Sequence, residues 1–214
     1  MLIKILDFNS NTGIGRNSAL ILILLIMFSS TVFGQADTYR KGVVIDSIQV
    51  GDSSETYTFY LPKSFDQNIL SAIVFIFDPS GRGWSGIQPF KSSAEKYNYI
   101  LICSNNSKNG PYSTNFEIIN RLFDSVFSTF NIDEKQIYVA GFSGGSRLAT
   151  AIAVLTDQIQ GVIACGAGFS PESSHMPLSK ESFSYVGLVG ERDMNYYEMF
   201  EVRDWLDRFQ IENE

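Results

Sequence analysis

The sequence is poor in histidine, cysteine and positive charge. Its 214 residues contain one histidine, His175, and two cysteines, Cys103 and Cys165. Lys and Arg number 16 against 23 Asp and Glu, so the formal net charge is −7, and a nucleic-acid partner is not expected because it would need a basic patch. One histidine and two separated cysteines form no metal-ligand cluster, and no GxxxxGK loop is present, so neither a metal nor a cofactor is expected.

An apolar run long enough to span a bilayer is also lacking near the N-terminus. The run ALILILLIMF at 19–28 follows Lys4 and Arg16, and its length is typical of a signal peptide. Val32 and Gly34 stand at the −3 and −1 positions of a cleavage site. The sequence therefore predicts a signal peptide at 1–34 and one domain at 35–214. It predicts a secreted or periplasmic protein without stable membrane insertion after cleavage, and an uncleaved anchor is the alternative.

The rest of the chain has the composition and patterning of a layered α/β domain. Apolar residues make up 44%, which is enough for a buried core. Two β-rich segments joined by a turn, 42–51 and 55–62, predict a hairpin. Continuous apolar runs, typical of strands buried on both faces, lie at 72–78, 99–104, 137–142, 161–168 and 185–190. Helical periodicity separates them at 86–97, 116–130, 148–155 and 197–209.

Strands that alternate with helices predict an α/β fold with a doubly wound, mostly parallel sheet behind the hairpin. In such sheets functional groups gather beyond the carboxyl ends of the strands. Several apolar runs here end in polar or Gly-rich loops. One of them, SNNSKNG at 104–110, is expected to border any site at this edge of the sheet.

One of these loops contains the pattern Gly-x-Ser-x-Gly, with Ser143 at its centre and Gly141, Gly144 and Gly145 around it. It lies between a predicted strand and a predicted helix. So sharp a turn holds the serine in a strained conformation, lifts its hydroxyl above the sheet and requires small neighbours. It also places the Gly144 N–H at a helix N-terminus, where an oxyanion is stabilised. The alternative is a Gly-rich turn whose serine has no chemical role.

With this strand–GxSxG–helix arrangement, residues 42–210 resemble an α/β-hydrolase of the branch that includes dienelactone-hydrolase-like proteins, secreted esterases and polyester depolymerases. The resemblance implies that Ser143 is a nucleophile. It also implies that the loop FDPSGRG at 77–83 supplies a second oxyanion-hole N–H from Gly81 or Arg82, with Ser80-Gly81 where the family has His-Gly. An ordinary Pro-Ser-Gly turn is the alternative for this loop.

The resemblance further places a carboxylate after the seventh strand, where Asp193 stands and Glu191 is the second candidate. Asp193 would hold an imidazole in the productive tautomer, and capping of the following helix is the alternative. The base should be a histidine after an eighth strand, but no histidine follows Asp193. His175 precedes it, in a Ser-rich loop where a surface residue is expected and a catalytic role is the alternative.

A serine without a base is a poor nucleophile, and loss of a triad member lowers rates by about 10⁴–10⁶-fold. The sequence is therefore expected to be a C-terminally truncated α/β-hydrolase that lacks the last strand and leaves the seventh strand as an edge. The predicted function is hydrolysis of small-molecule or polymer carboxylic esters through a Ser143 acyl-enzyme. A non-catalytic binding module or an inactive fragment is the alternative, and whether the chain is an enzyme stays open.

The two cysteines are expected not to form a disulfide. The strand order 4-3-5-6 implied by the resemblance puts Cys103 and Cys165 three strand spacings apart, about 14 Å at roughly 4.8 Å per spacing. A disulfide needs Cα atoms within about 7 Å. Two buried free thiols are predicted.

Overall fold

A computed structural model describes residues 39–169 and 183–214. The predicted signal peptide at 1–34 and the candidate His175 lie outside these ranges. Within them, no helix combines the length and the apolar character needed to cross a membrane.

Seven strands form one sheet in the order β1-β2-β4-β3-β5-β6-β7. β1 and β2 pair antiparallel, as predicted for the hairpin, and β2 pairs antiparallel with β4. All pairs from β4 to β7 are parallel, which confirms the predicted fold class and the order 4-3-5-6. The strands are β1 (Val44–Gln49), β2 (Thr56–Tyr60), β3 (Ser71–Phe77), β4 (Ile100–Ser104), β5 (Ile132–Phe142), β6 (Gly161–Cys165) and β7 (Ser184–Leu188).

The predicted helices are present, and one of them is divided. The segment expected at 86–97 consists of two short α-helices with a 3₁₀ turn between them, and Pro89 lies in the first positions of that turn. Proline has no N–H to continue an α-helical ladder, which accounts for the break. The helical elements are α2 (Gly83–Ile87), η2 (Gln88–Phe90), α3 (Lys91–Tyr97), α4 (Tyr112–Thr129), α5 (Gly144–Leu155) and α6 (Tyr196–Arg208).

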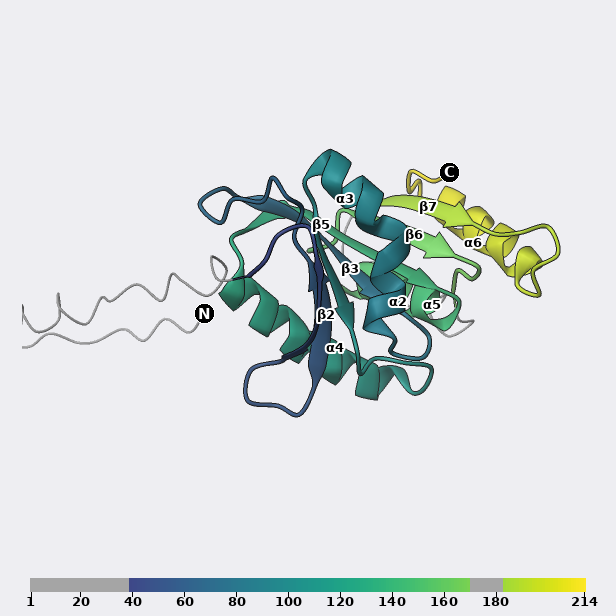
Figure 1. The fold of residues 1–214 in the computed structure, drawn as a ribbon. Helices are drawn as coiled ribbons and strands as arrows, with labels where there is room; N and C mark the ends of the chain where they lie inside the picture. Colours follow the sequence, from purple (N-terminus) through teal and green to yellow (C-terminus); the bar gives the residue numbers. More distant parts are fainter. Residues whose placement is uncertain (1–38, 170–182) are drawn as a thin grey trace, which may run out of the picture. The chain divides into compact units, whose positions relative to one another are not determined.

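Different helices cover the two faces of the sheet (Figure 1). α4, α5 and α6 pack on one face, where Phe75 and Phe77 of β3 join the larger apolar cluster. α2 and α3 pack on the other face, where Val74 and Ile76 contact the smaller cluster around Ile87. Because successive strand residues point to opposite faces, a strand between two helical layers is apolar throughout. This explains the continuous apolar run of β3.

The residues that follow α6 run along the outer side of β7. The Tyr185 N–H donates to the Glu212 carbonyl at 2.8 Å, and the Gly187 N–H donates to the Glu214 carbonyl at 2.8 Å. Asn213 lies opposite Tyr185 in a parallel bridge. β7 is the last strand of the sheet, as predicted, but the expectation of unpaired backbone groups along it is wrong at Tyr185 and Gly187, which bond to residues 212–214.

Both cysteines are free, as predicted. Cys103 is fully buried in the smaller apolar cluster, but Cys165 is only half-buried, so the prediction of two buried thiols is wrong for Cys165. The reason is that the helices on this face of the sheet do not extend over Cys165. α2 packs on β2, β3 and β4, and α3 packs on β4, whereas Cys165 lies two strands further along the sheet.

This difference in burial is measurable as thiol reactivity. Burial, reinforced by the nearby charge of Asp78, raises the pKa of the Cys103 thiol to about 12, and burial also raises the pKa of Cys165. Since the thiolate is the reacting species, we expect iodoacetamide at slightly alkaline pH to alkylate Cys165 slowly and to spare Cys103 until urea unfolds the protein. Mass spectrometry of peptides from unreduced protein checks this, and a 103–165 disulfide would contradict it.

Candidate active site

Ser143 occupies the turn between β5 and α5 in a strained conformation. Its backbone has φ 52° and ψ −119°, which a residue with a side chain rarely adopts. The Ser143 N–H donates to the Cys165 carbonyl at 2.8 Å, and the Ser143 carbonyl accepts the N–H groups of Ser146 and Arg147. The predicted strained turn is confirmed, and its serine is partly exposed at the carboxyl edge of the sheet.

The glycines next to Ser143 allow backbone segments to touch. A Cβ on Gly145 would lie 1.9 Å from the carbonyl oxygen of Phe77, the last residue of β3. A Cβ on Gly141 would lie 2.3 Å from the carbonyl group of Gly145. The first turn of α5 therefore rests directly on the end of β3, and this contact fixes the height of Ser143 above the sheet.

We expect Gly145→Ala to lower the free energy of unfolding by about 3 kcal/mol, the upper part of the usual range for an overpacked core. The added methyl group would meet backbone atoms, which cannot rotate away. Gly190→Ala is the matched control, because a Cβ there meets nothing within 4 Å. Urea denaturation of the two variants measures the difference, and equal stabilities would contradict the packing described for Gly145.

Asp193 lies between β7 and α6, and its carboxylate reaches toward the Ser143 turn. A Cβ on Gly166 would lie 3.5 Å from Asp193 Oδ2 and 3.2 Å from the ring of Phe142, the neighbour of Ser143. Asp193 Oδ1 accepts the Asn195 N–H at 2.8 Å, whereas Oδ2 has no donor within the described ranges. The N-cap of α6 is Asn195, not Asp193, and Glu191 is exposed.

A polar network that the sequence did not reveal holds the Asp193 loop beside the nucleophile helix. Arg147 of α5 donates to both carboxylate oxygens of Glu198 on α6, at 2.9 and 2.5 Å, and to Asn195 Oδ1 at 3.1 Å. Glu198 also accepts the Gly168 N–H, and the Asn195 amide donates to the Gly166 carbonyl at 2.7 Å. These bonds join α5, α6 and the end of β6. Arg147 and Glu198 are too far apart in the sequence for a local spacing pattern to predict their contact.

Removing Glu198 should loosen this connection. We expect Glu198→Ala to cost about 2 kcal/mol of unfolding free energy, because hydrogen bonds to charged groups contribute roughly 1.5–3 kcal/mol and Arg147 would lose its half-buried partner. Glu201→Ala, an exposed position on the same helix, is the control and should change stability by less than about 0.5 kcal/mol. Thermal or urea unfolding followed by circular dichroism makes the comparison.

The backbone N–H groups of the loop after β3 donate to acceptors within the same loop. The Gly81 N–H donates to the Asp78 carbonyl at 3.0 Å, and the N–H groups of Ser80 and Arg82 donate to Asp78 Oδ1 at 2.8 and 3.2 Å. Burial acts to raise the pKa of Asp78, but the Arg82 guanidinium and these N–H groups outweigh it and hold that pKa below its usual range. In this conformation neither Gly81 nor Arg82 presents a free N–H to a substrate.

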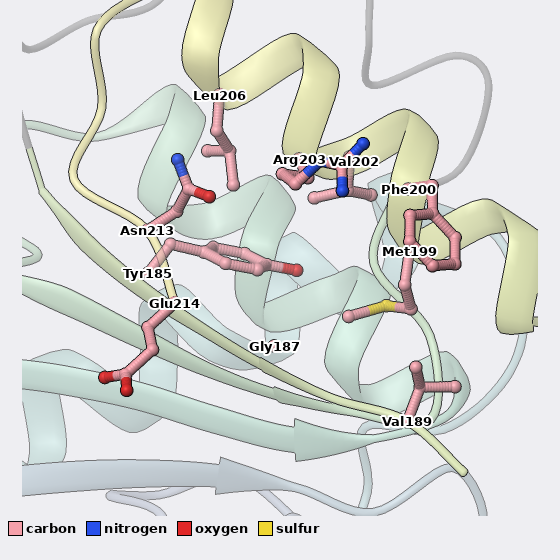
Figure 2. Close-up of a pocket in the computed structure, with 10 residues that line it drawn as sticks. All are labelled: Tyr185, Gly187, Val189, Met199, Phe200, Val202, Arg203, Leu206, Asn213 and Glu214. Carbon is pink, nitrogen blue, oxygen red and sulfur yellow. The ribbon is translucent and has the colours of Figure 1, made fainter. Parts of the chain in front are cut away.

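A cavity of about 300 Å³ lies away from Ser143, between β7, α6 and the C-terminal residues (Figure 2). Its walls are mainly apolar, and the Met199 methyl group lies 2.7 Å from where Gly187 would carry a Cβ. Met199 and Phe200 of α6 lie at one end of the view, and Asn213 and Glu214 lie at the other. Neither Ser143 nor Asp193 lines it, so it is not the candidate active site.

Comparison with solved structures agrees with the fold described above. The chain is similar to an S-formylglutathione hydrolase from Staphylococcus aureus (TM-score 0.62, 13% identity, 82% of this chain and 89% of that one). The fold is that of the α/β-hydrolases. A dienelactone hydrolase-like phosphotriesterase from metagenomic libraries (0.60, 11%, 80% and 79%) and a feruloyl esterase module from Clostridium thermocellum (0.60, 13%, 81% and 81%) have the same fold. No protein-family model and no curated protein sequence matches the chain.

Proposed function

We propose that this protein is a serine hydrolase that cleaves carboxylic esters through an acyl-enzyme on Ser143. The observation that carries the proposal is the strained Ser143 turn, followed by a helix whose first N–H, that of Gly144, has no acceptor within residues 39–169 or 183–214. A serine held this way beside a free helix N-terminal N–H suits attack on a carbonyl group. Structures with this fold include an S-formylglutathione hydrolase and a feruloyl esterase module, and these activities support the same chemistry.

In the proposed reaction, Ser143 Oγ attacks the ester carbonyl carbon while its proton passes to a base. The carbonyl oxygen becomes an oxyanion that the Gly144 N–H and the positive end of α5 stabilise. The intermediate collapses, the alcohol leaves with the proton, and the acyl group stays on Ser143. A water molecule then repeats the attack, releases the acid and restores the serine.

The proposed reaction also needs a group that accepts the proton of Ser143. The described residues include no histidine, and His175 lies in the segment outside them. The free Oδ2 of Asp193, which faces Gly166 beside the Ser143 turn, supports a role in orienting an imidazole. We propose Asp193 as the acid of a triad whose base the described residues do not supply.

The surface around the turn fits an apolar or aromatic ester. Phe142 is 56% exposed next to Ser143, and Met194 and Tyr197 are 94% and 79% exposed beside the Asp193 loop. Exposed side chains of this kind favour contact with a small-molecule ester or a polymer surface. Together with the predicted signal peptide at 1–34, they support an exported enzyme that meets its ester outside the cytoplasm.

The test supplies the missing base as free imidazole. We expect the protein with imidazole at neutral pH to hydrolyse 4-nitrophenyl acetate about 10²-fold faster than Ser143→Ala under the same conditions, since a general base contributes about 10²–10⁴-fold and only the protein with the serine can use it. Ser143→Ala with imidazole measures the rate that does not depend on the serine, including catalysis by imidazole itself. A fluorophosphonate should label Ser143 and no other residue. Equal rates for the two proteins, with no labelling, would favour a non-catalytic binding module instead.

A further inference from the structure

We propose that the side-chain amide of Asn109 is the second oxyanion-hole donor, acting together with the Gly144 N–H. The inference rests on the proposed function and assigns a residue of the same site. Tetrahedral intermediates of ester cleavage carry a full negative charge on one oxygen, and one N–H alone stabilises it incompletely. A second donor is therefore expected close to Gly144.

The backbone of the loop after β3 does not offer that donor. Its N–H groups from Ser80 to Arg82 all donate to Asp78, and the Gly83 N–H donates to Asn105 Oδ1 at 3.1 Å. Freeing one of them would leave the buried Asp78 carboxylate or carbonyl with fewer donors. That cost would oppose any gain from binding the oxyanion.

The loop after β4 holds Asn109 in place from several sides. The Asn109 N–H donates to the Pro79 carbonyl at 2.9 Å, which ties it to the loop after β3. One residue earlier, the buried side chain of Asn115 accepts the Lys108 N–H and donates to the Lys108 carbonyl, both at 3.0 Å. At the start of the loop, Ser104 Oγ accepts the Ser107 N–H at 3.0 Å.

The side chain of Asn109, in contrast, has no hydrogen-bond partner in the described part of the chain, although it lies against the nucleophile turn. A Cβ on Gly144 would stand 1.7 Å from Asn109 Oδ1 and 3.3 Å from Asn109 Nδ2. The exposed amide therefore lies beside the Gly144 Cα with Oδ1 nearer than Nδ2, and a rotation about the last side-chain torsion exchanges the two atoms and brings Nδ2 to this position. Only a glycine at 144 leaves this space open.

These positions make the Asn109 side chain a candidate donor on a fixed backbone. Its backbone is fixed before substrate binds, its Nδ2 carries two N–H groups without acceptors, and it adds no charge that would repel the developing oxyanion. An amide side chain fulfils this role in other hydrolytic sites, where its removal lowers kcat by about 10²–10³-fold. The effect belongs to the transition state, so KM should change little.

The experiment compares Asn109→Leu, Asn109→Ala and wild-type protein in imidazole-supported hydrolysis of 4-nitrophenyl acetate. Leucine keeps the branched shape of asparagine and lacks the donor. We expect both variants to lower kcat by at least about 10-fold at nearly constant KM, and to slow fluorophosphonate labelling of Ser143 by about 10²-fold. Lys108→Ala, an exposed neighbour in the same loop, is the control and should keep wild-type rates.

The outcomes separate this inference from the proposed function. Wild-type protein that labels and turns over, with an Asn109→Leu variant of equal kcat, would overturn the role of Asn109 alone. Absence of both labelling and turnover in wild-type protein would overturn the proposed function and the inference together. An increase of KM at constant kcat would also overturn the inference, because it would show ordinary substrate contact. Urea unfolding confirms that each variant is folded before its rates are compared.

Discussion

The close approach of α5 to the end of β3 is the constraint on which the candidate site depends. Phe77 pairs with Gly141 in the sheet, and its carbonyl oxygen occupies the space where Gly145 would otherwise carry a Cβ. The chain must therefore turn within one residue, and Ser143 takes the strained conformation between these two glycines. Strain of this kind, about 1–3 kcal/mol, persists only where surrounding packing over-determines it. Here the buried β3 and the apolar face of α5 supply that packing.

Around this fixed turn, the polar groups separate into those with partners and those without. Asp78, Arg147 and Glu198 are tied into hydrogen bonds that hold the neighbouring loops. Among residues 39–169 and 183–214, the Gly144 N–H, the Asn109 amide and Asp193 Oδ2 have no hydrogen-bond partner. Groups that hold a scaffold need their partners, whereas groups that bind a transition state must be free beforehand. The division is what a preorganised site requires.

The sequence predicts the fold well because the signals are local. Each strand of the parallel sheet is an apolar run, and the glycines around Ser143 mark a turn that no other residue fits. The division of the helix at Pro89 and the partial exposure of Cys165 depend on which face of the sheet each helix covers. No local sequence pattern predicts that placement. The Arg147–Glu198 bond and the contact of Asn109 with Gly144 join residues about 50 and 35 positions apart, so they become visible only when the sheet brings its carboxyl ends together.

In the proposed site, the groups around Ser143 are held without any contact to a base. The conformation of Ser143 depends on Phe77 and Gly145, and the position of Asp193 depends on the network of Arg147, Asn195 and Glu198. None of these contacts involves a histidine. The proposed oxyanion donors and the Asp193 carboxylate therefore keep their positions whether or not an imidazole is bound in the proposed site. An external base then has little to reorganise when it enters. For this reason the rate of ester hydrolysis with imidazole should depend mainly on how well the oxyanion hole stabilises the transition state. In an enzyme whose triad histidine is part of the packing, removing that histidine would also disturb the other groups of the site.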